Sequence, residues 1–421
     1  MDEWQAESLL IERDEKNREV SHTIYLGMNS IILTAQNLRP EKTGIHARLS
    51  IALNATELAF TVCNIERSDE RTRIVNEAYK FLGSTPEEAS MTIDKGSLKF
   101  KLNQFCKEAW DAWLSVQSPV DVEGTDTSAV SYVLKPHVLT GGGTIMFGKP
   151  GRGKSFTAMM MALAVNYGTN HYWDTDKGKA LFINLERPDR TIPPRINAVG
   201  KSLGLNSTSL AVYPGRSKRF VDIRDILERY ILKEDIKFVV LDSISRTGAG
   251  DMKEDKVATA TIDMLNLLGV SWVAIAHTPK YDDRIYYGSS QYEAGADVML
   301  RHSAKIVDDE GSIVVLLEVT KANDMPIPRP MGLHYSFDNI GLSAIRTATK
   351  TETAPLVDDS NLYQSIKEYL MESGGNTASE LSYIYDRDEK EVTSHLRSMF
   401  TANVLTSVGS KNNEKVYGVL V

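Results

Sequence analysis

The spacing of apolar residues in the first part of the chain predicts a small mixed domain. In residues 45–62, apolar residues alternate with mostly polar ones on both sides of a turn-like segment at 54–57, which predicts a β-hairpin. Two stretches with helical spacing follow, with apolar faces formed by Ile74, Ala78 and Phe81 and by Leu98, Leu102, Phe105, Ala109 and Trp113. Residues 1–118 are therefore expected to form an N-terminal α+β accessory domain.

The middle of the chain shows a different pattern. A stretch without helical period, residues 119–136, is interpreted as a linker that ends in an entry strand. After it, strand-like and helix-like segments alternate, with strands expected at 144–147, 180–185, 237–241, 271–276 and 313–319. This alternation predicts a parallel sheet covered by helices, so residues 137–346 are expected to form an α/β domain.

The end of the chain predicts a third, compact unit. Residues 347–360 are interpreted as a second linker. Three helical stretches follow, the second opened by a capping box at 377–380 and the third by the acidic segment at 388–391. Two strand-like pairs then flank a turn at 409–413. Three helices plus a hairpin are typical of a winged-helix domain, expected over residues 361–421.

Composition limits the kind of protein without changing these boundaries. A chain of 421 residues suits two or three domains. No apolar run reaches the length of a membrane span, and the acidic start lacks the apolar segment of a secretory signal, so a cytoplasmic protein that does not contact membranes is expected. Cys63 and Cys106 form no metal-ligand spacing and are expected to be buried thiols.

Both end regions of the chain carry a net negative charge. Residues 1–118 hold 18 acidic and 14 basic side chains, and residues 358–421 hold 10 and 6, so each end carries a net charge of −4. The middle is balanced, with 28 of each sign, which accounts for the total of −8. Binding to nucleic acid would therefore depend on local loops or on an assembled ring rather than on a globally basic surface.

One motif in the central region carries specific chemistry. The segment GKPGRGKS fits the pattern G-x-x-x-x-G-K-S that binds nucleotide phosphates, with an apolar strand before it and a helix after it. The glycines let backbone amides point at the phosphates, the lysine neutralises the β- and γ-phosphates, and the serine hydroxyl is a ligand for Mg²⁺. The expected ATP-binding residues are Gly148, Lys149, Pro150, Gly151, Arg152, Gly153, Lys154, Ser155 and Phe156.

A second motif completes the metal site. Asp242 ends the apolar strand VVLD, which would place its carboxylate at the edge of the sheet beside the phosphate-binding loop. There it can hold Mg²⁺ together with Ser155. Alone this signal is weak, but behind a phosphate-binding loop it is strong.

At this point the chain resembles the RecA-fold ATPases of the RepA type, relatives of the DnaB-like hexameric replicative helicases. The resemblance covers about residues 137–345 and is carried by GKPGRGKS, LFINLERPDRTIPPRI, VVLDSISRTGAGDMKED, VSWVAIAHTPK and YYGSSQYEAGADVMLRH. It implies a RecA-like core, ATP and Mg²⁺ as cofactors, and assembly into a hexameric ring or filament. It also implies that Glu186 orients the attacking water and that His277 is the sensor of the γ-phosphate, whereas Asp297 is expected to be structural.

One segment departs from the family pattern. These enzymes often carry Lys-x-Arg near the end of the domain, and both side chains reach the γ-phosphate of the neighbouring subunit. Lys321 matches, but Asn323 stands where the arginine would be. Arg329 in the next loop is the candidate to replace it. Lys321 and Arg329 are therefore the expected trans-acting residues.

Two loops of the central region are candidates for single-stranded DNA binding. The loop after Asp242 offers Arg246 and Lys253, and the loop after His277 offers Lys280, Arg284 and Tyr287. Basic side chains next to aromatic ones suit the phosphates and bases of a single strand. Two aspartates in the second loop, at 282 and 283, weaken this interpretation.

Three functions stay open from the sequence. The leading hypothesis is an ATP-dependent DNA helicase or translocase that acts as an oligomer on single-stranded DNA in the replication of a mobile element. The second is a RecA-like recombination ATPase that does not unwind duplex DNA, and the third is a switch ATPase with protein partners. The end domains could recruit replication or recombination proteins. The acidic winged-helix unit is expected to dock protein rather than to read DNA.

Overall fold

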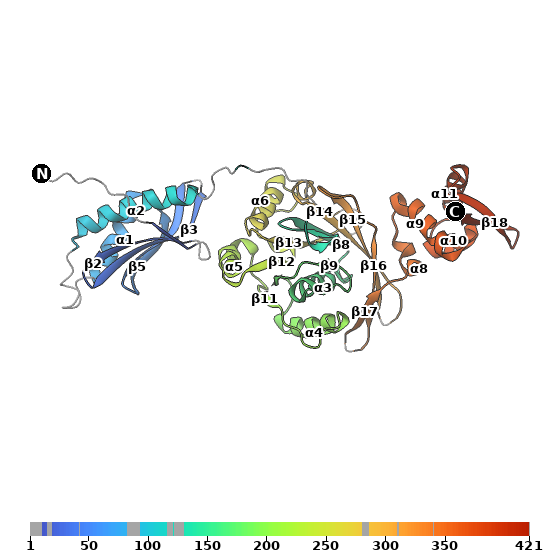
Figure 1. The fold of residues 1–421 in the computed structure, drawn as a ribbon, viewed down its shortest axis with the longest axis horizontal. Helices are drawn as coiled ribbons and strands as arrows, with labels where there is room; N and C mark the ends of the chain where they lie inside the picture. Colours follow the sequence, from blue (N-terminus) through green and yellow to red (C-terminus); the bar gives the residue numbers. More distant parts are fainter. Residues whose placement is uncertain are drawn as a thin grey trace. The chain divides into compact units, whose positions relative to one another are not determined.

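The chain forms two compact units in the computed structural model. The structure describes residues 11–14, 19–41, 43–81, 93–115, 121, 130–279, 286–309, 311–339 and 341–420. One unit comprises Met1–Ser128 with Asp225–Lys233, and the other comprises Ala129–Arg224 with Glu234–Val421. Figure 1 shows the ribbon of both, and each unit is described here by itself.

The N-terminal unit is an antiparallel sheet covered on one face by helices. Its five strands lie in chain order: β1 (Glu12–Asp14), β2 (Glu19–Leu26), β3 (Asn29–Glu41), β4 (Gly44–Leu53) and β5 (Thr56–Asn64). Two helices, α1 (Ser68–Phe81) and α2 (Lys95–Ser115), pack against this sheet and against each other (Figure 1). Their apolar faces and the inward side chains of the strands form one buried core.

The hairpin predicted from alternation is confirmed as β4 and β5. The alternating apolar residues of β4 at 45, 47, 49 and 51 are buried, but on β5 the expected apolar face is wrong, because Phe60 and Val62 are 56% and 62% exposed. Asn54 makes the turn in the left-handed region with φ of 52°. The sequence reading missed β1, β2 and β3, where alternation is weaker. Phe81 was expected on the buried face of α1 but is 55% exposed, because it is the last helical residue. The side chain of Trp113 lies outside the described residues.

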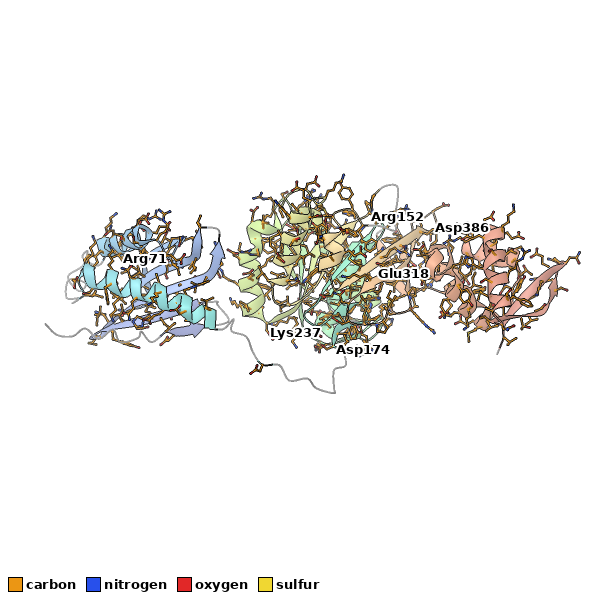
Figure 2. All side chains as sticks on the ribbon, turned by 90° about the horizontal axis from the view of Figure 1, so that it is seen from above. Arg71, Arg152, Asp174, Lys237, Glu318 and Asp386 are labelled. Carbon is orange, nitrogen blue, oxygen red and sulfur yellow. The ribbon has the colours of Figure 1, made fainter. Side chains whose placement is uncertain are left out.

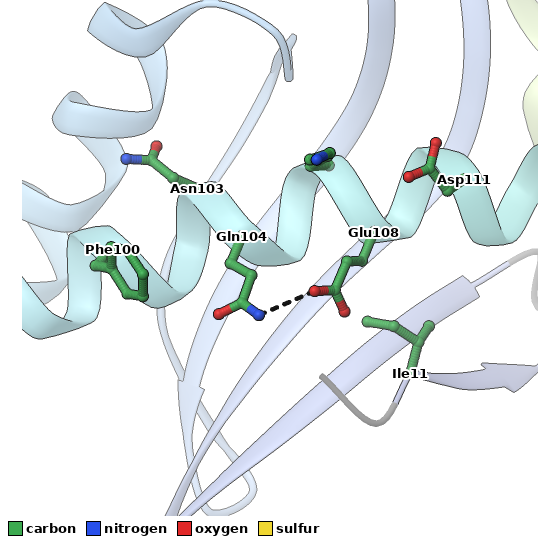
Figure 3. Close-up of a pocket in the computed structure, with 7 residues that line it drawn as sticks. Ile11, Phe100, Asn103, Gln104, Glu108 and Asp111 are labelled. Atoms are coloured by element: carbon green, nitrogen blue, oxygen red, sulfur yellow. Dashed lines mark hydrogen bonds between the residues drawn. The ribbon is translucent and has the colours of Figure 1, made fainter. Parts of the chain in front are cut away.

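A pocket lies beside the outer face of α2 (Figure 3). Most of the residues that line it are polar, and three of them bond within the unit. Gln104 Nε2 donates to Glu108 Oε1 at 2.9 Å, and Asn103 Oδ1 accepts from Arg71 Nε at 2.6 Å. Arg71 is marked in Figure 2. These partners account for Asn103, Gln104 and Glu108 without a ligand.

The central sheet of the second unit has nine strands, in the order β11-β10-β12-β13-β8-β14-β15-β16-β17. From β11 to β14 all neighbours are parallel, and from β14 to β17 they are antiparallel. The parallel strands are β8 (Gly143–Gly148), β10 (Lys179–Asn184), β11 (Ala211–Pro214), β12 (Ile236–Asp242), β13 (Ser271–His277) and β14 (Val298–Ile306). The antiparallel ones are β15 (Ile313–Ala322), β16 (Met331–Phe337) and β17 (Leu342–Thr347).

All five predicted central strands are confirmed as strands, but the sheet is mixed rather than parallel. The segment at 313–319 became an antiparallel strand because a short turn connects it to β14, and a parallel neighbour would need a long crossover. Four strands, β11, β14, β16 and β17, were missed. The large sheet with flanking helices fits a RecA-like core.

Helices cover this sheet on both sides (Figure 1). α3 (Lys154–Tyr167) packs on β10, β12 and β13, and α4 (Ile192–Ser202) packs on α3 and β17. α6 (Asp255–Asn266) lies on the side away from α3. Further elements are α7 (Gln291–Gly295) and a small sheet of β6 (Tyr132–Lys135), β7 (Val138–Leu139) and β9 (Asp174–Thr175). The helix α5 (Phe220–Glu234) is divided between the units, because its residues Asp225–Lys233 are grouped with the first one. No helix among the described residues is long and apolar enough to cross a membrane.

The C-terminal part contains the predicted three helices and a hairpin. These are α9 (Asp359–Ser373), α10 (Ala378–Tyr385), α11 (Glu389–Thr401), β18 (Leu405–Lys411) and β19 (Glu414–Val419). Thr377 and Glu380 form the capping box of α10, and Asp388 caps α11. The segment interpreted as a linker holds a short helix, α8 (Lys350–Thr353), and a further helical turn. The assignment as a winged helix stays a prediction.

A buried ionic network ties these C-terminal helices to the central sheet. Arg301 on β14 is 4% exposed and Glu318 on β15 is 2% exposed. The Nε of Arg301 donates to Glu318 at 3.1 Å, and its Nη1 donates to Asp358 at 2.8 Å. Asn361 on α9 donates to the other oxygen of Glu318. Figure 2 marks Glu318 within the sheet. The network fixes the C-terminal helices against two strands of the central sheet.

We predict that Arg301→Met lowers the free energy of unfolding by about 3–5 kcal/mol, because it leaves the buried carboxylate of Glu318 unpaired. Adding Glu318→Met should restore part of the loss. The control is Lys305→Met, since Lys305 pairs with exposed Asp386 and the change should cost less than about 1 kcal/mol. Guanidinium unfolding followed by circular dichroism measures all three, and equal losses for Arg301→Met and Lys305→Met would contradict the prediction.

Candidate nucleotide-binding site

The phosphate-binding loop connects a buried strand to a buried helix. β8 ends at Gly148, and α3 begins at Lys154. At Gly148 a Cβ atom would lie 2.3 Å from the carbonyl oxygen of His302, so β14 leaves no room for a side chain. Gly151 and Gly153 have φ of 69° and 92°, which glycine adopts without strain. Packing therefore requires glycine at 148, and the backbone conformation favours it at 151 and 153.

Lys154 is buried at the start of α3 and is 4% exposed. Its Nζ donates to the carbonyl oxygens of Gly148 and Lys149 at 2.6 and 2.7 Å. Burial lowers its pKa to about 8, although the carboxylates of Asp242 and Glu186 act in the opposite direction. Hydrogen bonds to the loop carbonyls therefore hold this lysine within the loop that is predicted to bind phosphate. Of the other loop residues, Lys149, Pro150 and Gly151 are exposed, while Arg152, Gly153 and Phe156 are half-buried; Figure 2 marks Arg152.

The sheet register brings the two acidic site residues together. β10 and β12 are parallel neighbours with Asn184 opposite Asp242, and the amide of Leu185 donates to the carbonyl of Asp242 at 2.8 Å. Glu186 follows directly. Because both strands end at the same edge, a carboxylate from each lies beside the loop.

Asp242 is 1% exposed, and burial raises its pKa, while the hydroxyl of Ser155 acts to lower it. Its Oδ2 has no hydrogen-bond partner in the described part of the chain. An orphaned buried carboxylate oxygen next to a serine hydroxyl is a hard donor set that fits Mg²⁺. Ser155 and Asp242 are therefore the residues that would hold the metal.

Glu186 is held by hydroxyl groups beside this pair. Its Oε1 accepts from Ser243 and, at 3.1 Å, from Ser245. The Nε2 of His277 lies 3.7 Å from the same oxygen. His277 first, and then the serine hydroxyls, lower the pKa of Glu186 to about 2 against the effect of burial. A carboxylate with so low a pKa is suited to orienting a water molecule rather than to taking its proton.

His277 ends β13 opposite Gly148 of β8. The register therefore places the predicted sensor at the first glycine of the loop. Its Nδ1 is buried without a partner among the described residues. Asp297, expected to be structural, accepts from the amide of Gly143 at 2.8 Å and from Asn323 at 3.3 Å.

Three groups near the loop were missed by sequence reasoning. Arg187 donates from Nη2 to Ser155 Oγ at 3.4 Å. The guanidinium of Arg195 on α4 lies 4.4 Å from the ring centroid of Phe156, and burial lowers its pKa to about 10, with a further lowering by Arg187. Both belong to the segment that resembles the family, and the basic residue beside Glu186 was a signal that could have been used.

The third group is a buried network under the loop. The hydroxyl of Thr157 bonds to His302 Nε2 at 3.0 Å and to the hydroxyl of Tyr335 at 2.7 Å. Burial, together with the charge of Lys154, lowers the pKa of His302 to about 3. The imidazole is therefore neutral at physiological pH. Nothing in the sequence pattern marked His302, because a lone histidine in a strand has no motif.

The expected trans-acting residues are engaged within their own chain. Lys321 Nζ donates to the carbonyl oxygens of Glu293 and Ala296 at 2.5 and 2.6 Å, at the end of α7. This gives Lys321 a structural task that the sequence did not suggest. Arg329 has an 82% exposed side chain with its Nε 3.3 Å from Glu368. The trans-acting roles stay predictions.

One contact connects the two loops that are candidates for DNA binding. Lys253, from the loop after Asp242, places its Nζ 5.3 Å from the ring centroid of Tyr287, from the loop after His277. Arg246 is exposed at the end of a short helical turn after β12. Lys280 and Arg284 lie outside the described residues. The structure thus brings together one cation and one aromatic ring of the predicted set.

Comparison with known proteins supports the class of the central domain. A family model described as an AAA domain matches residues 115–283, which include the loop, Glu186, Asp242 and His277. The match supports a P-loop ATPase domain in the central part of the chain. A KaiC-like protein from the hyperthermophilic archaeon Pyrococcus horikoshii matches with a TM-score of 0.37 and 14% identity, over 54% of this chain and 100% of that chain. No curated protein matches.

We predict that Glu186→Gln keeps nucleotide binding and lowers the rate of ATP hydrolysis by about 10²–10⁴-fold, because the amide keeps the size but not the charge that orients water. Lys154→Ala should instead weaken binding itself. Phosphate release and equilibrium binding of a fluorescent ATP analogue separate the two effects. Wild-type turnover in Glu186→Gln would show that the glutamate has no role in hydrolysis.

We predict an acid-sensitive fold caused partly by His302. Its pKa in the folded state, about 3, lies below the ordinary 6.5, so between these values only the unfolded chain binds the proton. The stabilisation is complete above pH 6.5 and is lost as the pH falls towards 3, by up to about 1.4 kcal/mol per pH unit. In His302→Gln, the free energy of unfolding should fall less steeply with decreasing pH between pH 5.5 and 4, by up to about 1.4 kcal/mol per pH unit. Urea unfolding at a series of pH values measures it, and parallel curves would contradict the assignment.

Proposed function

We propose that the central domain binds ATP with Mg²⁺ and hydrolyses it. The observation that carries this proposal is the convergence of Lys154, Ser155, Asp242 and Glu186 at one edge of the sheet. Lys154 would leave the loop carbonyls for the β- and γ-phosphates, and Ser155 and Asp242 would hold the metal. Bound Mg²⁺ supplies charge neutralisation of the phosphates.

Hydrolysis would require a side chain that orients the attacking water and positive charges that bind the phosphates. Glu186 would accept a hydrogen bond from the attacking water, and His277, next to both Glu186 and the loop, would respond to the γ-phosphate. Arg195, a half-buried cation with no ion pair in the described part of the chain, supports additional binding of phosphate charge. Burial makes such a cation costly unless an anion approaches it.

We further propose that turnover drives movement along single-stranded DNA, as a RepA/DnaB-type helicase or translocase that works as a hexameric ring or filament in the cytoplasm. The five segments that resemble this family support the proposal, as does the contact of Lys253 with Tyr287. A cation next to an exposed aromatic ring can bind a phosphate and stack on a base. Replication of a mobile element is the expected setting, with Arg329 and Lys321 acting across the subunit interface.

A switch ATPase with protein partners is the second candidate, and the C-terminal part favours it. In the hairpin, Lys411 Nζ pairs with Glu380 at 2.5 Å, and Lys415 Nζ lies 3.3 Å from the ring centroid of Phe400. Both cations that a wing would offer to DNA have partners in their own domain. Residues 361–421 hold 8 acidic and 6 basic side chains, a net charge of −2, and this also supports protein docking by the C-terminal part. A recombination ATPase on single-stranded DNA remains the alternative without unwinding.

We predict that single-stranded DNA stimulates ATP hydrolysis and that Lys253→Ala with Tyr287→Ala weakens binding to oligothymidylate about tenfold or more, because stacking contributes about 1–3 kcal/mol per base. The control is Lys237→Ala, an exposed lysine near the start of β12, at the opposite edge of the sheet from the site (Figure 2). Fluorescence anisotropy measures the affinity.

Three outcomes separate the candidate functions. Strand displacement by an oligomer, with its mass measured by light scattering, supports the helicase. Stimulation by DNA without displacement supports the recombination ATPase. ATP hydrolysis that DNA leaves unchanged contradicts both and supports the switch ATPase.

A further inference from the structure

Arg187, directly after Glu186, presents a hydrogen-bonding edge that lacks a good acceptor. Its Nη2 is 3.4 Å from Ser155 Oγ, which is long for a hydrogen bond, and its Nε is buried with no partner in the described part of the chain. Nε and Nη2 together form the edge of a guanidinium that binds two oxygens of one anion. Arg219 uses this edge on Asp222, with both distances 2.7 Å.

The position of Arg187 does not depend on its own side chain. Asn184, the buried last residue of β10, donates from Nδ2 to the carbonyl oxygen of Arg187 at 2.9 Å. Its Oδ1 accepts from the amide of Arg187 at 3.0 Å. The backbone is therefore fixed beside the loop, and a change of the side chain at 187 leaves this anchor intact.

The open edge has a chemical consequence. Arg187 forms no ion pair among the described residues. The carboxylates of Asp242 and Glu186 are near the loop, since their charges act on the pKa of Lys154, but neither pairs with Arg187. A buried donor without an acceptor costs about 1–3 kcal/mol, more when it is charged. A neutral serine hydroxyl at 3.4 Å compensates little of that cost. A phosphate oxygen pair would satisfy Nε and Nη2 at once.

We propose that Arg187 binds two oxygens of the γ-phosphate of ATP in its own subunit through its Nε–Nη2 edge. This inference rests on the proposed function of the site. The γ-phosphate is chosen because Arg187 is adjacent to Glu186, the residue placed to orient the attacking water, and borders the hydroxyl of Ser155. A cation acting within the subunit also compensates for Asn323, which stands where an arginine from the neighbour is expected.

The test compares a nucleotide that has a γ-phosphate with one that lacks it. The probes are ATPγS and ADP, each with Mg²⁺, titrated by calorimetry into the full-length chain. Arg187→Ala should weaken ATPγS binding about 10- to 100-fold, the effect of losing a charged hydrogen-bonded pair, and change ADP binding less than about threefold. Arg187→Lys keeps the positive charge but lacks the paired donors of the guanidinium, so its affinity for ATPγS should lie between those of the wild type and Arg187→Ala. Arg190→Ala, an exposed arginine on the same segment, should change neither affinity.

Each outcome decides a separate question. If wild-type chain binds both nucleotides and Arg187→Ala weakens them equally or not at all, the γ-phosphate role of Arg187 is overturned and the proposed function stands. If the wild-type chain binds neither nucleotide, the proposed function falls and this inference falls with it. Thermal melting checks that Arg187→Ala is folded; should it fail to fold, Arg187→Lys with wild-type ATPγS affinity would overturn the inference.

Discussion

The burial of charge at one edge of the central sheet is the constraint on which the rest of the site depends. Lys154 and Asp242 are almost fully buried, and burial opposes the ionised form of each. Such groups persist only where partners offset the desolvation. Within the chain, loop carbonyls satisfy Lys154, but Asp242 Oδ2 and Arg187 Nε stay without partners in the described residues. The orphaned groups have opposite signs, which suits a metal cation bound to a phosphate anion.

The parallel strands explain how these groups converge from distant positions in the sequence. β8, β10, β12 and β13 run in the same direction, so their carboxyl ends bring the loop, Glu186, Asp242 and His277 to one edge. The strands beyond β8 in the sheet order serve a different purpose. β14 places His302 under the loop and Arg301 in the network that holds the C-terminal helices. One strand thus contacts both the nucleotide site and the C-terminal part through adjacent residues.

The sequence predicted those features that have a short-range signal. The glycines at 151 and 153, the strand ending at Asp242 and the capping box at Thr377 follow from local backbone chemistry, and each is present at the residue expected. It missed features that arise from long-range packing. The antiparallel strands β16 and β17 are only partly buried, so their hydrophobic pattern is diluted. Arg301 and Glu318 look like surface charges in a sequence, because burial becomes evident only when β14, β15 and α9 are assembled.

The engagement of Lys321 by carbonyl oxygens bears on the proposed coupling of hydrolysis between subunits. A lysine that holds the end of α7 would have to break two short hydrogen bonds before reaching a neighbouring site. Arg187 requires no such exchange, since one donor of its edge is unpaired and the other is weakly bonded. If the cation that completes the γ-phosphate site comes from the same subunit, ATP can be bound fully before a neighbour is correctly placed. Assembly would then regulate the later step, the positioning of water and the release of phosphate, rather than the binding of ATP itself.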